Sequence, residues 1–322
     1  MSRARRRLKT LVGAASVLYA PGDRDATQGV RRAASLARKA EAGKITGLFT
    51  ADLLQADPAG LAGTTGSQEP IVALAVLNVP PSPQRRPVLF QAGQSASGVT
   101  LGARYAEVVY TSQPTLDDAR AFVAELHRQA VAFGRGDRLP LVMNSFHSVI
   151  GESDADVARR LRDKHERIDY EQGRLKLADM LGGGVDLPLD QPLPVSLLPA
   201  IDSVHRRRGR VAIFVGYARQ RLTLRELIIR AQETGHWSVA GTPEQLADAI
   251  EARYRAGLVD VLTLHGLGQP DQEDLLLDGL LPELRRRGLV DTDYPGGDFR
   301  ANLELPALQR AFEHTEPLND YP

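Results

Sequence analysis

The sequence predicts an α/β protein in which helices cover a parallel sheet. Short apolar runs typical of strands alternate with amphipathic helical segments along the chain. The 322 residues are 43% hydrophobic and 25% charged, which is the composition of an ordinary globular protein. No internal repeat indicates a solenoid. Periodicity alone leaves the choice between an open sheet and a closed (β/α)8 barrel open.

Six apolar runs are expected to form the strands. They are residues 11–19, 45–50, 87–92, 106–112, 139–150 and 259–264. Residues 211–217 are a candidate for a seventh strand.

Helices are expected between these runs, and cap residues mark several of their ends. The expected helices are residues 30–42, a segment from 70, a segment after Ser95, 116–133, a polar helix from 153 to about 168, a segment from 224, 243–256 and 272–288. Thr115, Thr223 and Thr242 are expected to cap three of them, because each precedes an acidic or amide residue by three positions. Asp271 is expected to cap the last one.

Two segments lack regular periodicity. Residues 182–209 contain three consecutive glycines and four prolines, which predicts an irregular insertion. Residues 289–322 are expected to wrap the surface as a tail, since the chain beyond Asp291 is rich in glycine and proline. The whole chain, residues 1–322, is expected to form a single domain that includes these two segments.

Composition excludes several classes of function. The 40 basic residues balance the 40 acidic ones, so nothing indicates nucleic acid or an anionic membrane as a partner. The absence of cysteine excludes disulfides, thiolate catalysis and thiolate metal sites. No apolar run approaches the ~20 residues of a membrane helix. Residues 11–19 are interpreted as a strand and not as a signal peptide, which favours the cytoplasm.

One loop has the composition of a phosphate site. Gly93, Gln94 and Ser95 follow a predicted strand and precede a predicted helix. Free N–H groups at a helix start can bind a phosphate, although for the loop alone a plain helix cap is the simpler interpretation. Ser97 stands where a hydrolase nucleophile elbow needs its second glycine, and the Gly-Lys-Ser/Thr of a Walker loop is absent.

Other polar residues could face a site at the strand ends. Asp52 follows the second predicted strand, where it is either a turn residue or a pocket group. His147 and His265 lie near strand ends and could point into a pocket, but structural histidines are more common. His236-Trp237 is interpreted as a packing site. No histidine pair has the spacing of a helical zinc site.

Three longer segments together are more specific than any single motif. They are residues 87–95 with 106–111, residues 235–245, and residues 281–289 followed by Tyr294 and Asn302-Leu303. These segments resemble the flavin-dependent monooxygenases of the bacterial-luciferase superfamily. The group concerned is typified by nitrilotriacetate monooxygenase component A, dibenzothiophene-sulfone monooxygenase and pristinamycin synthase. The resemblance covers residues 87–306 and about 43–77.

The resemblance implies a (β/α)8 barrel of the TIM type that binds reduced FMN at the carboxyl ends of its strands. A separate flavin reductase would supply the FMN, and the chain would use O2 to oxygenate a small organic or organosulfur compound. Asp52 matches an acidic residue near the flavin, and Gly93, Gln94 and Ser95 match the loop that holds the FMN phosphate. No catalytic residue and no metal ligand are assigned. By this resemblance 211–217 is a helix.

The chain departs from the family between residues 78 and 87. Two strands and a long insertion of the family are missing there, because nine residues cannot hold a βαβ unit of ~30 residues. We therefore expect an incomplete barrel with about six of eight strands. Its open edges would favour a homo-oligomer. The alternative is a non-catalytic remnant that binds flavin weakly or self-associates through those edges.

Overall fold

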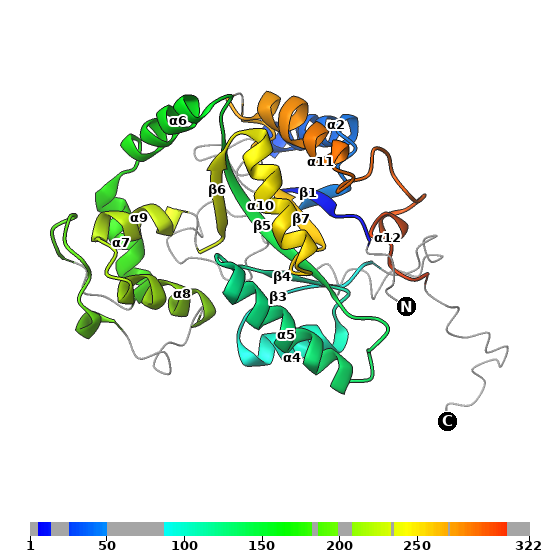
Figure 1. The fold of residues 1–322 in the computed structure, drawn as a ribbon, viewed down its shortest axis with the longest axis horizontal. Coiled ribbons are helices and arrows are strands. Elements are labelled where there is room, and N and C mark those ends of the chain that lie inside the picture. The colour runs from blue at the N-terminus through cyan, green and yellow to red at the C-terminus, as the bar shows by residue number, and fades with distance from the viewer. Residues whose placement is uncertain are drawn as a thin grey trace.

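The structure, a computed structural model, contains one parallel sheet with helices around it (Figure 1). It describes residues 6–13, 26–49, 87–181, 186–198, 208–232, 235–269 and 271–307. The strands are β1 (Lys9–Gly13), β2 (Gly47–Phe49), β3 (Phe90–Ala92), β4 (Val108–Thr111), β5 (Leu141–Ile150), β6 (Trp237–Gly241) and β7 (Val261–Leu264). A continuous path runs β2-β1-β7-β5-β4-β3, and β6 pairs with β5 beside it.

The sheet is an incomplete barrel, as the sequence predicts. Within the described residues β2 pairs only with β1 and β3 only with β4, so these two strands are the ends of the path. The missing strands of the family would lie between them. Each of the six strands of the path overlaps one of the six expected from the sequence. The first begins earlier than expected, at Lys9, and residues 14–19 of that prediction lie outside the described residues. The short strand β6 was not among the expected strands, because Trp237–Gly241 is only five residues long and has glycines at both margins.

The helices follow the cap signals closely. They are α2 (Ala26–Ala42), α4 (Ala96–Tyr105), α5 (Leu116–Ala132), α6 (Asp154–Glu166), α7 (Tyr170–Leu181), α8 (Arg208–Arg219), α9 (Leu224–Gln232), α10 (Pro243–Arg255), α11 (Leu281–Arg286) and α12 (Phe299–Asn302). Thr115 caps α5, and Thr242 forms a full capping box with Gln245. Thr223 and Glu226 exchange the same reciprocal bonds. Residues 211–217 lie in α8 and are helical, as the family pattern implies.

The structure differs from the sequence prediction in three places. The polar helix from 154 ends at Glu166 instead of 168, and a new helix, α7, begins at Tyr170. The helix expected from 272 contains a π-helical segment, Leu275–Leu280, before α11, and its cap is not Asp271. A further helix, α12, follows it. The helix expected from 70 lies outside the described residues.

The two faces of the sheet pack against different parts of the molecule. On the outer face, Val12, Phe146 and Leu262 pack with α2, α10 and α11, and Val109 and Val142 pack with α4 and α5. The inner face carries a second apolar layer made of Leu11, Val108, Leu141, Met143 and Val261. The alternation of side chains along each strand produces this division.

Residues 298–305 cover the inner face near the amino ends of the strands. Leu303 is fully buried there and joins the inner apolar layer. Arg300 is buried and donates two hydrogen bonds to Glu107, at 2.6 and 2.9 Å. Lys9 of β1 is also buried and pairs with both Asp291 and Glu304. The amino end is therefore closed by paired charges and apolar contacts, which leaves the carboxyl end for a site.

Helices α7, α8 and α9 form a separate unit beside the sheet (Figure 1). They have a hydrophobic core of their own, around Leu177, Phe214, Leu224 and Leu227. The irregular insertion joins this unit, since Pro192 bridges to Thr223 and Leu224 donates to the carbonyl of Gln191. The predicted insertion at 182–209 is thus a connection within this unit where the structure describes it.

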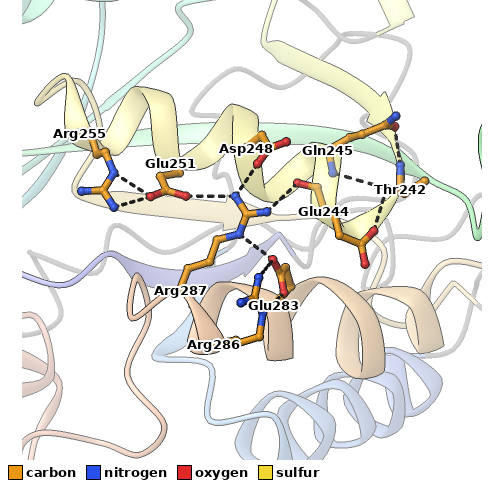
Figure 2. A network of polar contacts seen from close by, with 9 residues as sticks. All are labelled: Thr242, Glu244, Gln245, Asp248, Glu251, Arg255, Glu283, Arg286 and Arg287. Carbon is orange, nitrogen blue, oxygen red and sulfur yellow. Dashed lines mark hydrogen bonds and ion pairs between the residues drawn. The ribbon is translucent and has the colours of Figure 1, made fainter.

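A network of charges joins α10 to the end of α11 (Figure 2). Arg287 pairs with Glu283 at 2.7 Å, Asp248 at 2.6 Å and Glu251 at 3.0 Å. Its side chain is only 15% exposed, so solvent screens these pairs weakly. Hydrogen bonds from Arg286 and Arg287 lower the pKa of Glu283 to about 2.

We expect Arg287→Met to lower the free energy of unfolding by about 1–2 kcal/mol, because one guanidinium holds three carboxylates from two helices. Arg286→Met is the matched control. Arg286 is 71% exposed and shares only Glu283, so its loss should cost less than about 0.5 kcal/mol. Urea denaturation at low and high salt measures both variants. Equal, small effects for the two arginines would contradict a structural role for this network.

Candidate functional site at the carboxyl ends of the strands

The inner face changes character toward the carboxyl ends of the strands. Met143 belongs to the apolar layer, and the next side chains on the same face of β5 are Ser145 and His147. Along β7 the same alternation leads from Val261 through Thr263 to His265. Polar and imidazole groups therefore lie directly above an apolar floor.

Three imidazole rings stack across this region. The ring centroids of His147 and His265 are 4.3 Å apart, and those of His147 and His236 are 5.2 Å apart. The interplanar angles are 22° and 16°, so the three rings are nearly parallel. His236 reaches the row from the amino end of β6, because Trp237 pairs with Phe146 late in β5.

Two further rings continue the row. Tyr110 of β4 lies 5.8 Å from His236, and Phe49 at the end of β2 stacks on Tyr110 at 5.1 Å. Five rings from five strands or strand ends thus form one line. Because neighbouring rings cover each other's faces, the row offers mainly ring edges and polar ring atoms to a ligand.

Two serine hydroxyls hold the imidazoles in place. Ser145 Oγ lies 2.9 Å from His265 Nε2 and 3.3 Å from His147 Nε2. Ser112 Oγ lies 2.7 Å from His236 Nδ1. The hydroxyl of Thr263 is buried on the same face of β7, and it has no hydrogen-bond partner among the residues that the structure describes. An unpaired buried hydroxyl at this place suits a ligand or a bound water.

Burial keeps two of these imidazoles neutral. Desolvation, followed by the charge of Lys164, lowers the pKa of His147 to about 4. Desolvation, followed by repulsion from His147, lowers the pKa of His265 to about 3. At neutral pH both rings can therefore donate one hydrogen bond and accept another.

The loop predicted to bind phosphate lies at the same edge of the sheet. Gly93, Gln94 and Ser95 follow β3, and Ser95 caps α4 by accepting a hydrogen bond from Gly98 N at 3.2 Å. The loop is tightly folded, because a Cβ atom on Gly98 would lie 3.1 Å from the carbonyl carbon of Gly93. Gly93 has a φ of +159°, at the limit of the region that favours glycine.

A chain of polar contacts connects this loop to the core. The side-chain amides of Gln94 and Gln113 are 2.9 Å apart. Arg253 of α10 donates to the carbonyls of Gln113 at 2.8 Å and of Pro114 at 2.9 Å. Arg253 is 2% exposed, and its guanidinium lies 4.0 Å from the ring centre of Trp237. A buried cation thus fixes the segment against which Gln94 rests.

The structure brings together some of the predicted residues and adds others. His147 and His265, the two histidines noted near strand ends, lie side by side. His236 also contributes to the row. The interpretation of His236-Trp237 as a packing site missed this contribution, because His236 lies just before β6. The polar run Asn144-Ser145 inside an apolar strand was the available signal for Ser145. Asp52 lies outside the described residues.

The part of the chain that the structure describes contains neither a metal site nor a membrane-spanning helix. Its His, Asp and Glu side chains include no group of three or more with the geometry to hold a metal ion. Its helices include none with the length and hydropathy to span a membrane.

Comparison with known proteins identifies the family to which this fold belongs. Residues 74–260, more than half of the chain, match the family described as luciferase-like monooxygenase. The chain belongs to the luciferase-like monooxygenase family. This luciferase-like chain is 33% identical over 234 residues to nitrilotriacetate monooxygenase component A of Aminobacter aminovorans. The match covers 71% of the chain and 51% of that protein, so the chain spans about half the length of this curated relative.

Solved structures support the fold of the luciferase-like chain. EDTA monooxygenase from Chelativorans sp. BNC1 superimposes with a TM-score of 0.63 at 20% identity, covering 94% of this chain and 99% of that one. Riboflavin lyase, solved with modified FMN and riboflavin, gives a TM-score of 0.56 at 26% identity. That match covers 70% of this chain and 49% of the lyase.

Proposed function

We propose that the chain is a flavin-dependent monooxygenase that binds reduced FMN at the carboxyl ends of its strands. The observation that supports this best is the position of the capped loop at 93–95. It lies at the same sheet edge as the stacked rings, so a phosphate and a flat ring system could be held together. The related riboflavin lyase contains FMN, and the family name implies oxygenation.

The residues present fit an FMN molecule. Glycine at position 98 allows the 93–95 loop to fold tightly onto the start of α4, because a Cβ atom there would lie 3.1 Å from the carbonyl carbon of Gly93. The first N–H groups of α4 have no partners within the helix, and its positive end favours a phosphate. The unpaired hydroxyl of Thr263 gives the ring region a polar group that needs a partner. Asp52 is proposed as a further contact, by resemblance to the family.

Reduced FMN would supply the reaction with oxygen, and the protein would supply the environment. Ser95 and the start of α4 would hold the phosphate. The apolar layer around Met143 and Val261 would exclude water beneath the ring. His147 and His265, which are neutral at pH 7, would accept or donate hydrogen bonds without placing a fixed charge beside the ring.

The partners follow from the relatives in the same way. A separate flavin reductase would deliver the reduced FMN, and the substrate would be a small organic or organosulfur compound. Related proteins are named for nitrilotriacetate and for dibenzothiophene sulfone. Self-association of the chain through its open edges and a cytoplasmic location stay predictions from the sequence.

A fluorescence titration with FMN, oxidised and then reduced under anaerobic conditions, tests the proposal. We expect saturable binding that Ser95→Ala weakens by about 5- to 30-fold, which corresponds to about 1–2 kcal/mol for a lost cap and a reorganised loop. Riboflavin, which lacks the phosphate, should bind Ser95→Ala and the native chain equally.

Thr115→Ala is the matched control for this experiment. It removes the cap of the neighbouring helix α5 and leaves the 93–95 loop intact. FMN affinity should therefore stay within about twofold of the native value. A folded chain that binds no flavin would refute the proposal and support the non-catalytic remnant.

A further inference from the structure

The strongest unassigned feature of the molecule is the hydroxyl that lies between two imidazoles. Ser145 is 3% exposed, and its Oγ lies 2.9 Å from His265 Nε2 and 3.3 Å from His147 Nε2. A hydroxyl has one proton, so it can donate to one ring only while it accepts from the other. One imidazole must then have its proton on Nε2 while the other has Nε2 free. The tautomers of the two rings are therefore linked.

We propose that His147, Ser145 and His265 form a proton relay on the inner face of the sheet, serving the ligand bound at the carboxyl ends. Its role in catalysis rests on the proposed function, whereas the relay itself does not. A proton arrives on Nδ1 of the first ring, whose Nε2 proton moves to Ser145 Oγ. The Ser145 proton moves to Nε2 of the second ring, which releases its Nδ1 proton. One proton enters, one leaves, and no electrons are transferred.

The surroundings favour transfer over storage of charge. The two rings stack at 4.3 Å, so a charge on one opposes a charge on the other. Lys164 from α6 adds further repulsion at His147, and His236 from β6 stacks on the opposite face of that ring. Tyr110 from β4 lies beyond His236, 3.5 Å from its Nε2. No carboxylate contacts either ring of the relay among the hydrogen bonds of the described residues, so no neighbouring anion stabilises a charged imidazole there.

The placement also distinguishes a relay from a purely structural contact. Both rings are partly exposed and both lie at the carboxyl ends, where the apolar layer stops. They can exchange protons with solvent and with a bound molecule.

Nitrogen NMR of the full chain, labelled with 15N in histidine, tests the relay without flavin. We expect two neutral rings at pH 7 with opposite protonation at Nε2. Ser145→Ala should change the tautomer populations of both rings, and Ser145→Thr, which keeps the hydroxyl, should restore the linkage. His127 on α5, another buried imidazole, is the internal reference and should not change. Tautomers that stay unchanged in Ser145→Ala would overturn the relay.

A kinetic measurement tests whether the relay takes part in catalysis. Bound reduced FMN is mixed with O2, and the return of oxidised FMN with release of H2O2 is followed across pH 6–9. With FMN at saturation, we expect Ser145→Ala to slow this proton-dependent reaction by at least about 10-fold and Ser145→Thr to recover most of the rate. A native rate and pH profile in Ser145→Ala would overturn the catalytic role. A chain that binds no FMN would refute the proposed function instead, and NMR would still decide the relay.

Discussion

Arg253→Met is expected to lower the free energy of unfolding by about 3 kcal/mol. The substitution leaves the carbonyls of Gln113 and Pro114 unpaired in the protein interior, and each buried unpaired carbonyl costs about 1–3 kcal/mol. It also removes the contact between the guanidinium and the Trp237 ring. The relief of desolvation offsets part of the loss, because burial lowers the pKa of Arg253 to about 10 and thus opposes its charge.

Arg255→Met provides the control from the same helix. Arg255 is 68% exposed and pairs with Glu251 one turn away, so its loss should change stability by less than about 0.5 kcal/mol. Urea denaturation compares the midpoints at constant slope. A native midpoint for Arg253→Met would show that the segment after β4 does not depend on this cation. FMN titration of the same variant would then show whether Gln94 has lost its support.

Stability is expected to fall steeply as the pH decreases from 6.5 toward 4. The pKa of His147 is about 4 and that of His265 about 3 in the folded chain, whereas unfolded histidine titrates near about 6.5. The unfolded state therefore binds more protons in this window, and stability rises with pH. The full stabilisation is present above about pH 6.5. Its loss by pH 4 should be on the order of 3 kcal/mol for each ring, and thus on the order of 6 kcal/mol for the pair.

The pH window separates this effect from that of the carboxylates. Arginine hydrogen bonds lower the pKa of Glu283 and of Asp156 to about 2, so these groups lose their contribution only below about pH 4.5. Thermal or urea unfolding of the double variant His147→Gln/His265→Gln between pH 7 and 5 should give a flatter profile. His127→Gln, which removes a different buried imidazole, should flatten it less. An unchanged profile in the double variant would mean that the two rings already titrate normally.

The incomplete barrel and the candidate site are compatible because the site uses the strands that remain. The loop at 93–95 belongs to β3 and α4, and the relay belongs to β5 and β7. The missing segment would lie between β2 and β3, on the side of Phe49 and Tyr110. We therefore expect phosphate binding to depend less on the missing strands than substrate selection does.

Much of the fold could be predicted because its signals are local. Thr115, Thr223 and Thr242 mark helix starts through bonds to residues three positions away, and the structure contains all three caps. Apolar runs identified six strands, since burial on both faces of a parallel sheet leaves a continuous apolar pattern. The family segments fixed the helix at 211–217, which periodicity had left open.

The sequence by itself determined the α/β class, the helix caps at Thr115, Thr223 and Thr242, and the family. Each of these depends on neighbouring residues or on short segments of the chain. The tertiary structure alone decided that β6 starts beside the late part of β5, and this offset brings His236 to the row. It also decided that Ser145 lies between His147 and His265, which are 118 positions apart (265 − 147). Contacts of this kind depend on strand order and register, which the packing of the whole sheet selects and no local pattern encodes.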